Sequence, residues 1–202
     1  MKHNNEFCVI DLETSGLNPA DNAIVEVSIV VLNYDLENIE KYCKIVKPYN
    51  VLLKYEVESL KISKLTMKDI NSGSDSQVVI NEMCELFKRS KDRSGKKPVL
   101  VGHNIQSFDL PFLCRFFDFH KRNLWLFVEN YCIDTMWISR FAYKELDSYK
   151  LGAVCNRNGI SLSNAHSALG DVIANAELLK VFLKSLRGKE VEEKRFRTEF
   201  QF

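Results

Sequence analysis

Acidic residues and one histidine recur at the ends of apolar segments of this chain. Asp11 and Glu13 lie in FCVIDLETSGL, Asp109 lies in LVGHNIQSFDLPFL, and His166 and Asp171 lie in HSALGDV. A strand or helix that ends or begins at each place would present these side chains at the rim of a fold. Carboxylates beside an imidazole suit a divalent-metal site with an adjacent base, which is a site for cutting phosphodiester bonds.

The first motif is a D-x-E pair. Because side chains alternate along a strand, Asp11 and Glu13 would lie on one side of the pleat. Two like charges so placed repel each other unless a cation neutralises them. Carboxylate oxygens favour magnesium or manganese over zinc or copper. The alternative is a strand-to-loop turn that carries surface acids, and the pair taken by itself favours that alternative.

The third motif combines a histidine with an acid. Asp171 falls in the first turns of an expected helix, and its small neighbours Gly170 and Ala174 allow close approach to a sheet. His166 precedes that helix, and an imidazole can accept a proton from water near neutral pH. A lone histidine is more often structural, but two other acid motifs favour a base here. Two ions about 4 Å apart would serve an in-line displacement.

The second motif offers structural and functional interpretations together. Asp109 precedes Leu-Pro, so it could cap a helix and still support a metal. His103 and Asn104 follow a short apolar segment, where they could contact substrate or form a hydrogen-bonded turn. Most aromatic residues of this region are expected in the core. Phe108 and Leu17 are instead candidates for stacking on bases or wedging between them.

Apolar periodicity predicts an α/β fold. Segments rich in apolar residues predict strands at 7–12, 23–33, 41–46, 99–102 and 131–133. Helical spacing and cap residues predict helices at 76–89, 109–120, from 134 onward, 151–158 and 167–186, with Gly188 ending the last. Three strands followed by alternating helices and strands predict a mixed sheet with helices on its faces.

The charge balance neither demands nor excludes nucleic acid. The chain has 202 residues, 46% of them hydrophobic, which suffices for one sizeable domain, and its formal net charge is +1. Basic residues gather before the fourth strand, at Lys88, Arg89, Lys91, Arg93, Lys96 and Lys97. This run is interpreted as part of a solvated linker over 90–98, with a phosphate-steering patch as the alternative.

The cysteines and the apolar segments indicate a reducing compartment. Six cysteines are scattered without a C-x-x-C pair, so buried free thiols are expected. The start MKHNNEF does not resemble a signal peptide, and no apolar stretch is long enough to span a bilayer. These features predict a soluble, cytoplasmic protein without a membrane partner.

Taken together, the motifs resemble those of a known family. IDLETSGL, VGHNIQSFDLPFL and HSALGDV are similar, in this order, to the three motifs of the DEDDh 3′→5′ exonucleases, the DnaQ-like group. This group includes proofreading subunits, ribonuclease T, oligoribonuclease and the TREX enzymes. The resemblance covers Phe7 to Leu186, and DTMWISR and LGAVCNRNGI also look like family surroundings. It implies an RNase H-like fold with a mixed five-stranded sheet, an antiparallel start of three strands and then parallel strands.

The resemblance also implies roles for the motif residues. Asp11, Glu13 and Asp171 would hold one ion. Asp11 would bridge to a second ion, which Asp109 would support through water. His166 would be the general base, and the two ions would be Mg²⁺, with Mn²⁺ able to substitute. The products would be nucleoside 5′-monophosphates.

Substrate contacts follow from the resemblance as well. Glu13 and the backbone of Thr14 would meet the terminal 3′-hydroxyl, and Leu17 would wedge against the last base. The second motif departs from the commonest pattern, because His103 and Asp109 are one residue further apart. This spacing and D-L-P-F-L resemble the TREX-like variant, which favours DNA as substrate. It also weakens any direct transfer of the contacts of His103 and Asn104.

Three other functions are consistent with these motifs. The first is a 3′→5′ exoribonuclease of the ribonuclease T or oligoribonuclease type. The second is a nucleic-acid or protein adaptor without catalysis, and the third is an endonuclease of the wider RNase H-like class. The expected partner is single-stranded nucleic acid or a 3′ end, with a homodimer or a polymerase-type partner possible. Residues 1–188 would form the exonuclease domain, and residues 189–202 a charged tail or short helix.

Overall fold

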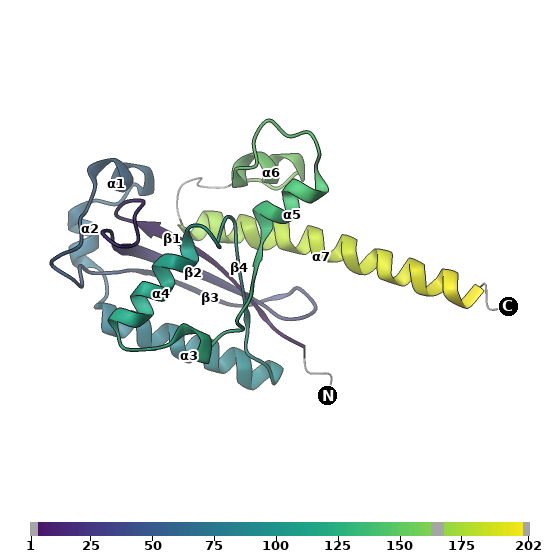
Figure 1. Cartoon of the computed structure of the whole chain (residues 1–202), viewed down its shortest axis with the longest axis horizontal. Helices are drawn as coiled ribbons and strands as arrows, with labels where there is room; N and C mark the ends of the chain where they lie inside the picture. The colour runs from purple at the N-terminus through teal and green to yellow at the C-terminus, as the bar shows by residue number, and fades with distance from the viewer. Residues whose placement is uncertain (1–3, 163–167, 200–202) are drawn as a thin grey trace.

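A five-stranded sheet forms the centre of the protein (Figure 1). The computed structural model describes residues 4–162 and 168–199, with side chains described as far as residue 188. The strands are β1 (Phe7–Thr14), β2 (Ile24–Leu32), β3 (Asn38–Ile45), β4 (Val99–Gly102) and β5 (Cys132–Asp134). Their order is β3-β2-β1-β4-β5, with β1, β2 and β3 antiparallel and β4 and β5 parallel to β1. The predicted mixed sheet is confirmed.

Helices cover both faces of this sheet. They are α1 (Val57–Ser63), α2 (Met67–Ser72), α3 (Ser76–Ser94), α4 (Asp109–Phe119), α5 (Thr135–Ala142), α6 (Leu151–Arg157) and α7 (Ala168–Glu199), with a short 3₁₀ turn at Leu124–Leu126. One face packs on α3 and α4, through even-numbered residues of β1 such as Cys8 and Ile10. The other face packs on α7, through odd-numbered residues such as Phe7 and Val9. The alternation of β1 therefore decides which side chains meet α7.

The helices differ from the prediction in three places. Helix α3 continues to Ser94, so the basic segment is helical for most of its length rather than a linker. Helix α7 continues through Gly188 to Glu199, because glycine lowers helix stability without terminating the helix by itself (Figure 1). Helices α1 and α2 were not predicted, since six or seven residues are too few to show a clear period.

The structure also describes the cysteines and the apolar character of the helices. No disulfide joins any of the six cysteines, all of which lie among the described residues, as the prediction of free thiols requires. Three of them, Cys8, Cys84 and Cys155, are buried. Within the described ranges, none of the helices combines the length and the apolar character needed to cross a lipid bilayer.

Candidate active site

Strand β1 delivers the first two acids to the face that α7 covers. Asp11 and Glu13 alternate with the buried Leu12, so both carboxylates leave the strand on the same side as Phe7 and Val9. The register with β2 shifts between Glu13 and Thr14, which makes a bulge at the end of the strand. Bulges of this kind re-aim side chains next to functional sites. Asp11 and Glu13 are partly buried there.

Helix α4 brings the third acid to the end of β1. Asp109 is the first residue of α4, and its carboxylate Oδ1 accepts a hydrogen bond from the Leu12 backbone N–H at 3.1 Å. The side chain is only 4% exposed. The expected cap is therefore corrected by one position, because Phe108 is the N-cap and Asp109 bonds across to β1. This bond ties two distant motifs together.

Helix α7 contributes Asp171 from its first turn. The electrostatic surroundings of Asp11 show that the motifs converge. Burial raises the pKa of Asp11 well above its ordinary value, and the charges of Asp109, Glu13, Asp171 and Glu26 raise it further. Asp109, Glu13 and Asp171 therefore lie close enough to Asp11 for their charges to act on it. That the four acids share a metal site stays a prediction.

The neighbouring carboxyls are shifted in the same direction. Burial raises the pKa of Glu13 to about 7, with further contributions from Glu26 and Asp171. Burial also raises the pKa of Asp109 to about 7, although the N–H of Leu12 acts against the rise. Within the described part of the chain, no lysine or arginine forms an ion pair with Asp11, Glu13 or Asp109.

The donor set fits a hard divalent cation. Carboxylate oxygens are the ligands that magnesium and manganese prefer, and a bound cation would supply the missing positive charge. The carboxylates do not stand in a preformed cage, since no three His, Cys, Asp or Glu side chains of the described residues form a ready metal-binding group.

A fifth acid, Glu26, belongs to the same cluster. It lies directly opposite Glu13 in the β1–β2 pair, and its Oε1 accepts a hydrogen bond from the Cys43 Sγ at 3.1 Å. No role for Glu26 was predicted from the sequence. The available signal was a charged residue inside the apolar segment AIVEVSIVV, where it interrupts a strand otherwise suited to the core.

The expected base lies outside the described residues. His166 falls in the segment 163–167, between α6 and α7, so its role as a base stays a prediction. Asp171, five residues later, is described and lies with the other acids.

His103 and Asn104 take part in a hydrogen-bonded turn after β4. The His103 Nδ1 lies 3.0 Å from Thr135 Oγ1, and its Nε2 lies 2.7 Å from the Tyr149 carbonyl oxygen. The Asn104 backbone N–H donates to Asp134 Oδ1 at 3.0 Å, and Asn104 has φ of 69°. Asparagine tolerates this left-handed conformation. Both ring nitrogens of His103 are engaged within the protein, which favours the structural alternative over substrate contact.

The remaining predicted contacts lie around the end of β1. The Thr14 hydroxyl donates to the Gly16 carbonyl at 2.7 Å, which leaves it engaged locally. Leu17, in the loop that follows, is 78% exposed. Phe108 is partly exposed, with its ring centroid 5.3 Å from that of Phe112. Leu17 and Phe108 are therefore accessible to a ligand, as wedging or stacking requires.

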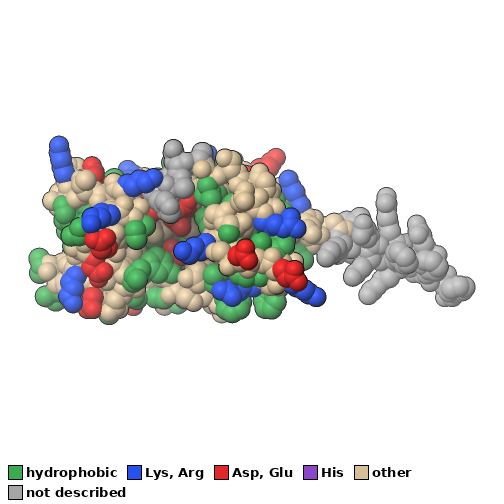
Figure 2. Space-filling model, turned by 90° about the horizontal axis from the view of Figure 1, so that it is seen from above, with side chains coloured by type: hydrophobic (Ala, Val, Ile, Leu, Met, Phe, Trp, Pro, Cys, Tyr) green, Lys and Arg blue, Asp and Glu red, His purple; other side chains and the backbone are tan. Residues whose placement is uncertain are grey.

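The surface above the sheet end combines both charges. Figure 2 shows red Asp and Glu atoms deep in the middle of this face, beside the grey atoms, and Lys and Arg side chains around them. Further Asp and Glu side chains lie among the Lys and Arg side chains toward the margins of this face (Figure 2).

The basic run near residue 90 lies at the opposite end of β1. Arg93 donates from Nη2 to Glu6 Oε2 at 3.0 Å and from Nη1 to Glu40 Oε2 at 3.1 Å, and Arg89 also pairs with Glu40. Glu6 precedes β1, so about 17 Å of strand separates it from Asp11. These ion pairs contradict the phosphate-steering alternative for the two arginines.

The chain matches known exonuclease sequences over most of its length. The model of the exonuclease family RNase_T matches residues 8–179. The PolC-type DNA polymerase III of Clostridium perfringens is 31% identical over 185 residues, which are 90% of this chain and 11% of that protein. The PolC-type polymerase of Caldanaerobacter subterraneus is 30% identical over 183 residues, which are 90% of this chain and 12% of that protein. The chain therefore spans about a tenth of the length of these relatives.

Solved structures share the fold. Escherichia coli Exonuclease I in complex with a dT13 oligonucleotide has a TM-score of 0.76 and 21% identity, over 96% of this chain and 44% of that one. A zinc-bound form of its complex with single-stranded DNA has a TM-score of 0.78 and 20% identity, over 96% of this chain and 43% of that one. The predicted RNase H-like fold is confirmed. Exonucleases of this family generally use divalent metal ions. The chain therefore belongs to the RNase_T family of exonucleases, the DEDDh or DnaQ-like group that its three motifs resemble.

Proposed function

We propose that this chain is a metal-dependent 3′→5′ exonuclease that removes nucleotides from the 3′ end of single-stranded DNA. The observation that carries the proposal is the convergence of Asp11, Glu13, Asp109 and Asp171 at one end of the sheet. Such a cluster is costly unless cations neutralise it, which indicates a functional rather than a stabilising arrangement. Membership of an exonuclease family supports phosphodiester hydrolysis.

The acids would act as metal ligands. Asp11, Glu13 and Asp171 would hold one ion, and Asp11 would also reach a second ion that Asp109 supports through water. Hard oxygen donors favour Mg²⁺, with Mn²⁺ as a substitute. The bound ions would lower the pKa of the attacking water and stabilise negative charge on the leaving oxygen.

The other residues would orient the strand and accept the proton. His166 would take the proton of the attacking water, a role that rests on its motif alone. The Thr14 backbone and Glu13 would meet the terminal 3′-hydroxyl, and Leu17 and Phe108 would hold the last base. Attack at the terminal phosphodiester would release nucleoside 5′-monophosphates.

The relatives support DNA as the substrate and a polymerase as the setting. Both named relatives are PolC-type DNA polymerases, and this chain matches only 11% or 12% of their lengths. We therefore propose that residues 1–188 form an exonuclease domain that works beside a DNA polymerase. Helix α7 continues to Glu199, and the division of the chain at residue 188 stays a prediction. A homodimer stays a prediction.

Digestion of labelled oligonucleotides tests the proposal. A single-stranded DNA labelled at its 5′ end, incubated in Mg²⁺, should yield a ladder that shortens from the 3′ end by single nucleotides. A matched RNA should react more slowly, and a circular DNA should stay intact. No digestion in Mg²⁺ or Mn²⁺ would reject the enzyme in favour of an adaptor. Faster digestion of RNA would assign an exoribonuclease, and cleavage of the circle an endonuclease.

A further inference from the structure

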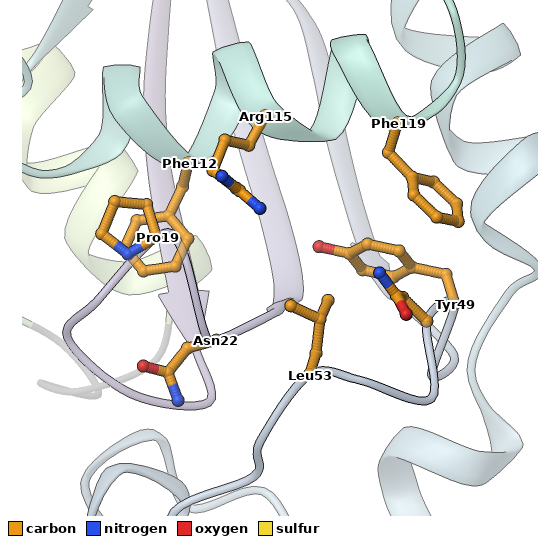
Figure 3. Close-up of a pocket in the computed structure, with 8 residues that line it drawn as sticks. Pro19, Asn22, Tyr49, Leu53, Phe112, Arg115 and Phe119 are labelled. Carbon is orange, nitrogen blue, oxygen red and sulfur yellow. The ribbon is translucent and has the colours of Figure 1, made fainter.

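A small cavity lies against the outer side of the loop that follows the D-x-E pair. Its volume is about 30 Å³, and it lies between three segments, the loop 15–22, the connection 46–54 and α4. Figure 3 shows the side chains that line it, with Arg115 and Phe112 reaching down from α4 and Tyr49 and Leu53 facing them. A space of this size admits a water-sized group such as a phosphate oxygen.

Arg115 supplies an uncompensated positive charge at this cavity. Its side chain is exposed, and its Nη2 donates to the Ala20 carbonyl oxygen at 3.3 Å. No carboxylate of the described residues forms an ion pair with Arg115, whereas Lys54, beside the same loop, is 3.9 Å from Asp21 Oδ2. An arginine that meets only a neutral carbonyl keeps its donors and its charge for an anion.

Tyr49 provides a second donor on the opposite wall. Its hydroxyl oxygen accepts the Ile24 backbone N–H at 3.3 Å, which leaves the hydroxyl proton available to donate. Burial raises the pKa of Tyr49 to about 12, and the nearby Arg115 charge acts weakly against that rise. In Figure 3 the Tyr49 hydroxyl and the Arg115 guanidinium both point into the cavity.

The walls of the cavity are held firmly. The Asn22 side chain donates to the carbonyl oxygens of Ser15 and Lys54, at 3.3 and 3.2 Å, and its Oδ1 accepts the Asn18 N–H at 3.0 Å. Gly16 lies so close to Asn22 that a Cβ there would stand 2.2 Å from the Asn22 side chain. Because the loop is fixed, the cavity keeps a constant position relative to the end of β1 at Thr14.

Helix α4 runs from the acid cluster to the cavity. Helix α4 begins at Asp109 and reaches Arg115 six residues later, about 9 Å along the helix axis. A strand with its 3′ end at the acids could extend over this wall with its next phosphates near the guanidinium. We propose that Arg115, assisted by the Tyr49 hydroxyl, binds a phosphate of the substrate strand on the 5′ side of the scissile bond. This assignment rests on the proposed function of the site.

Substrate length tests the assignment. A dinucleotide with a free 5′-hydroxyl contains only the scissile phosphate, whereas a fifteen-residue oligothymidylate contains many phosphates upstream. Wild type, Arg115→Ala, Arg115→Lys and Arg122→Ala are compared on both substrates, with kcat and KM measured separately. Arg122→Ala is the matched control, because it also removes one positive charge but at a position beyond the end of α4. The Arg122 side chain bonds to Asn81 there.

Arg115→Ala should raise the KM for the fifteen-residue substrate about tenfold, because hydrogen bonds to charged groups are the stronger ones. It should leave kcat and the hydrolysis of the dinucleotide unchanged. The slope of log KM against log salt should flatten by about 0.7, the contribution of one phosphate contact on a single strand. Arg115→Lys should retain the salt slope, since it retains the charge, and Arg122→Ala should match wild type.

Two results would overturn the assignment while leaving the proposed function intact. One is an Arg115→Ala variant with wild-type KM and salt slope on the long substrate. The other is an equal loss on both substrates, which would indicate damage to the site itself. If wild type cleaves only the long substrate, the salt slope decides alone. A wild-type chain that degrades neither substrate contradicts the proposed function, and this assignment with it.

Discussion

The two ends of β1 carry acidic side chains in opposite electrostatic surroundings. At its start, Glu6 and Glu40 meet Arg93 and Arg89 in ion pairs. At its end, Asp11, Glu13, Asp109 and Glu26 have no lysine or arginine partner among the described residues. The first arrangement joins α3 to the sheet. In the second, burial and neighbouring carboxylates raise the pKa values of Asp11, Glu13 and Asp109.

This difference separates stabilising acids from functional acids. Paired acids lower the energy of the folded chain, because each buried carboxylate keeps its charge beside a guanidinium. Unpaired acids destabilise the folded chain at neutral pH, and they persist where a ligand supplies the missing charge. Substitutions at the acid cluster should therefore lower turnover. Substitutions at the paired end should lower stability and leave turnover unchanged.

The largest effect is expected at the acid cluster. Asp11→Asn or Asp171→Asn should lower kcat on single-stranded DNA by about 1,000-fold or more, since a metal ion contributes several kcal/mol of charge stabilisation. Release of labelled mononucleotides in Mg²⁺ measures the loss. Glu40→Gln, on β3, is the control and should leave kcat unchanged, because this carboxylate pairs with Arg89 and Arg93. Retained turnover in either aspartate variant would remove that carboxylate from the metal site.

A smaller loss is expected from the proposed base. His166→Ala should lower kcat by about 100-fold to 10,000-fold, the usual contribution of a general base. The pH dependence of kcat should lose its acidic limb, because no imidazole remains to be deprotonated. His120→Ala serves as the control, since His120 lies at the far end of α4 against Gln77. A His166→Ala variant with wild-type turnover would contradict this role.

The paired end should respond in stability rather than in turnover. Arg93→Ala should lower the free energy of unfolding by about 3 kcal/mol, because it leaves the buried Glu6 carboxylate without its guanidinium. Urea unfolding followed by circular dichroism measures the change. Lys91→Ala, an exposed cation on the same helix, should be near neutral. A loss of kcat in Arg93→Ala at temperatures well below unfolding would contradict a purely stabilising role for these ion pairs.

The acid cluster should also make stability depend on pH when no metal is bound. The folded pKa of Glu13, about 7, lies above its ordinary value of 4.5, so the folded chain keeps a proton that the unfolded chain has released. Stability should therefore fall as pH rises from 4.5 to 7, by on the order of 2 kcal/mol. For a chain of this size that is a Tm lower by about 4–8 °C. Mn²⁺ should restore most of it at pH 8.

Thermal scans with EDTA or Mn²⁺ at pH 5 and pH 8 measure this dependence. His103, whose pKa burial lowers, acts in the opposite direction, so wild type is compared with Glu13→Gln under the same conditions. The variant should lose part of the fall between pH 5 and pH 8. Identical scans for both proteins would contradict the raised pKa of Glu13.

The fold was largely predictable because its strands are apolar and its longer helices are periodic. Strand β4 was predicted at its observed bounds, and β1 and β2 within two residues at each end. Helices α1 and α2 were missed, although Thr66 and Asp69 form a capping box that could have marked the start of α2. The end of α7 was misplaced, since Gly188 was given more weight than a helix requires.

The motifs predicted which acids would share a site, whereas the contacts around these acids were not predicted. Three motifs indicated which acids meet, and the structure places Asp11, Glu13, Asp109 and Asp171 together. The bond from Leu12 to Asp109, the pairing of Glu13 with Glu26 and the engagement of both His103 nitrogens were not predicted. Each joins residues far apart in sequence, so no local pattern could reveal it.

The sequence alone determined the chemistry available to this protein, because residue types and strand alternation decide which carboxylates share a face. It did not decide which charges stay unpaired. Arg89, Arg93 and Arg115 carry the same charge in the sequence. In the structure, Arg89 and Arg93 pair with carboxylates, whereas Arg115 bonds to a carbonyl oxygen. Charge compensation depends on distances between separate elements, and only the packing of α3 and α4 on the sheet sets those distances.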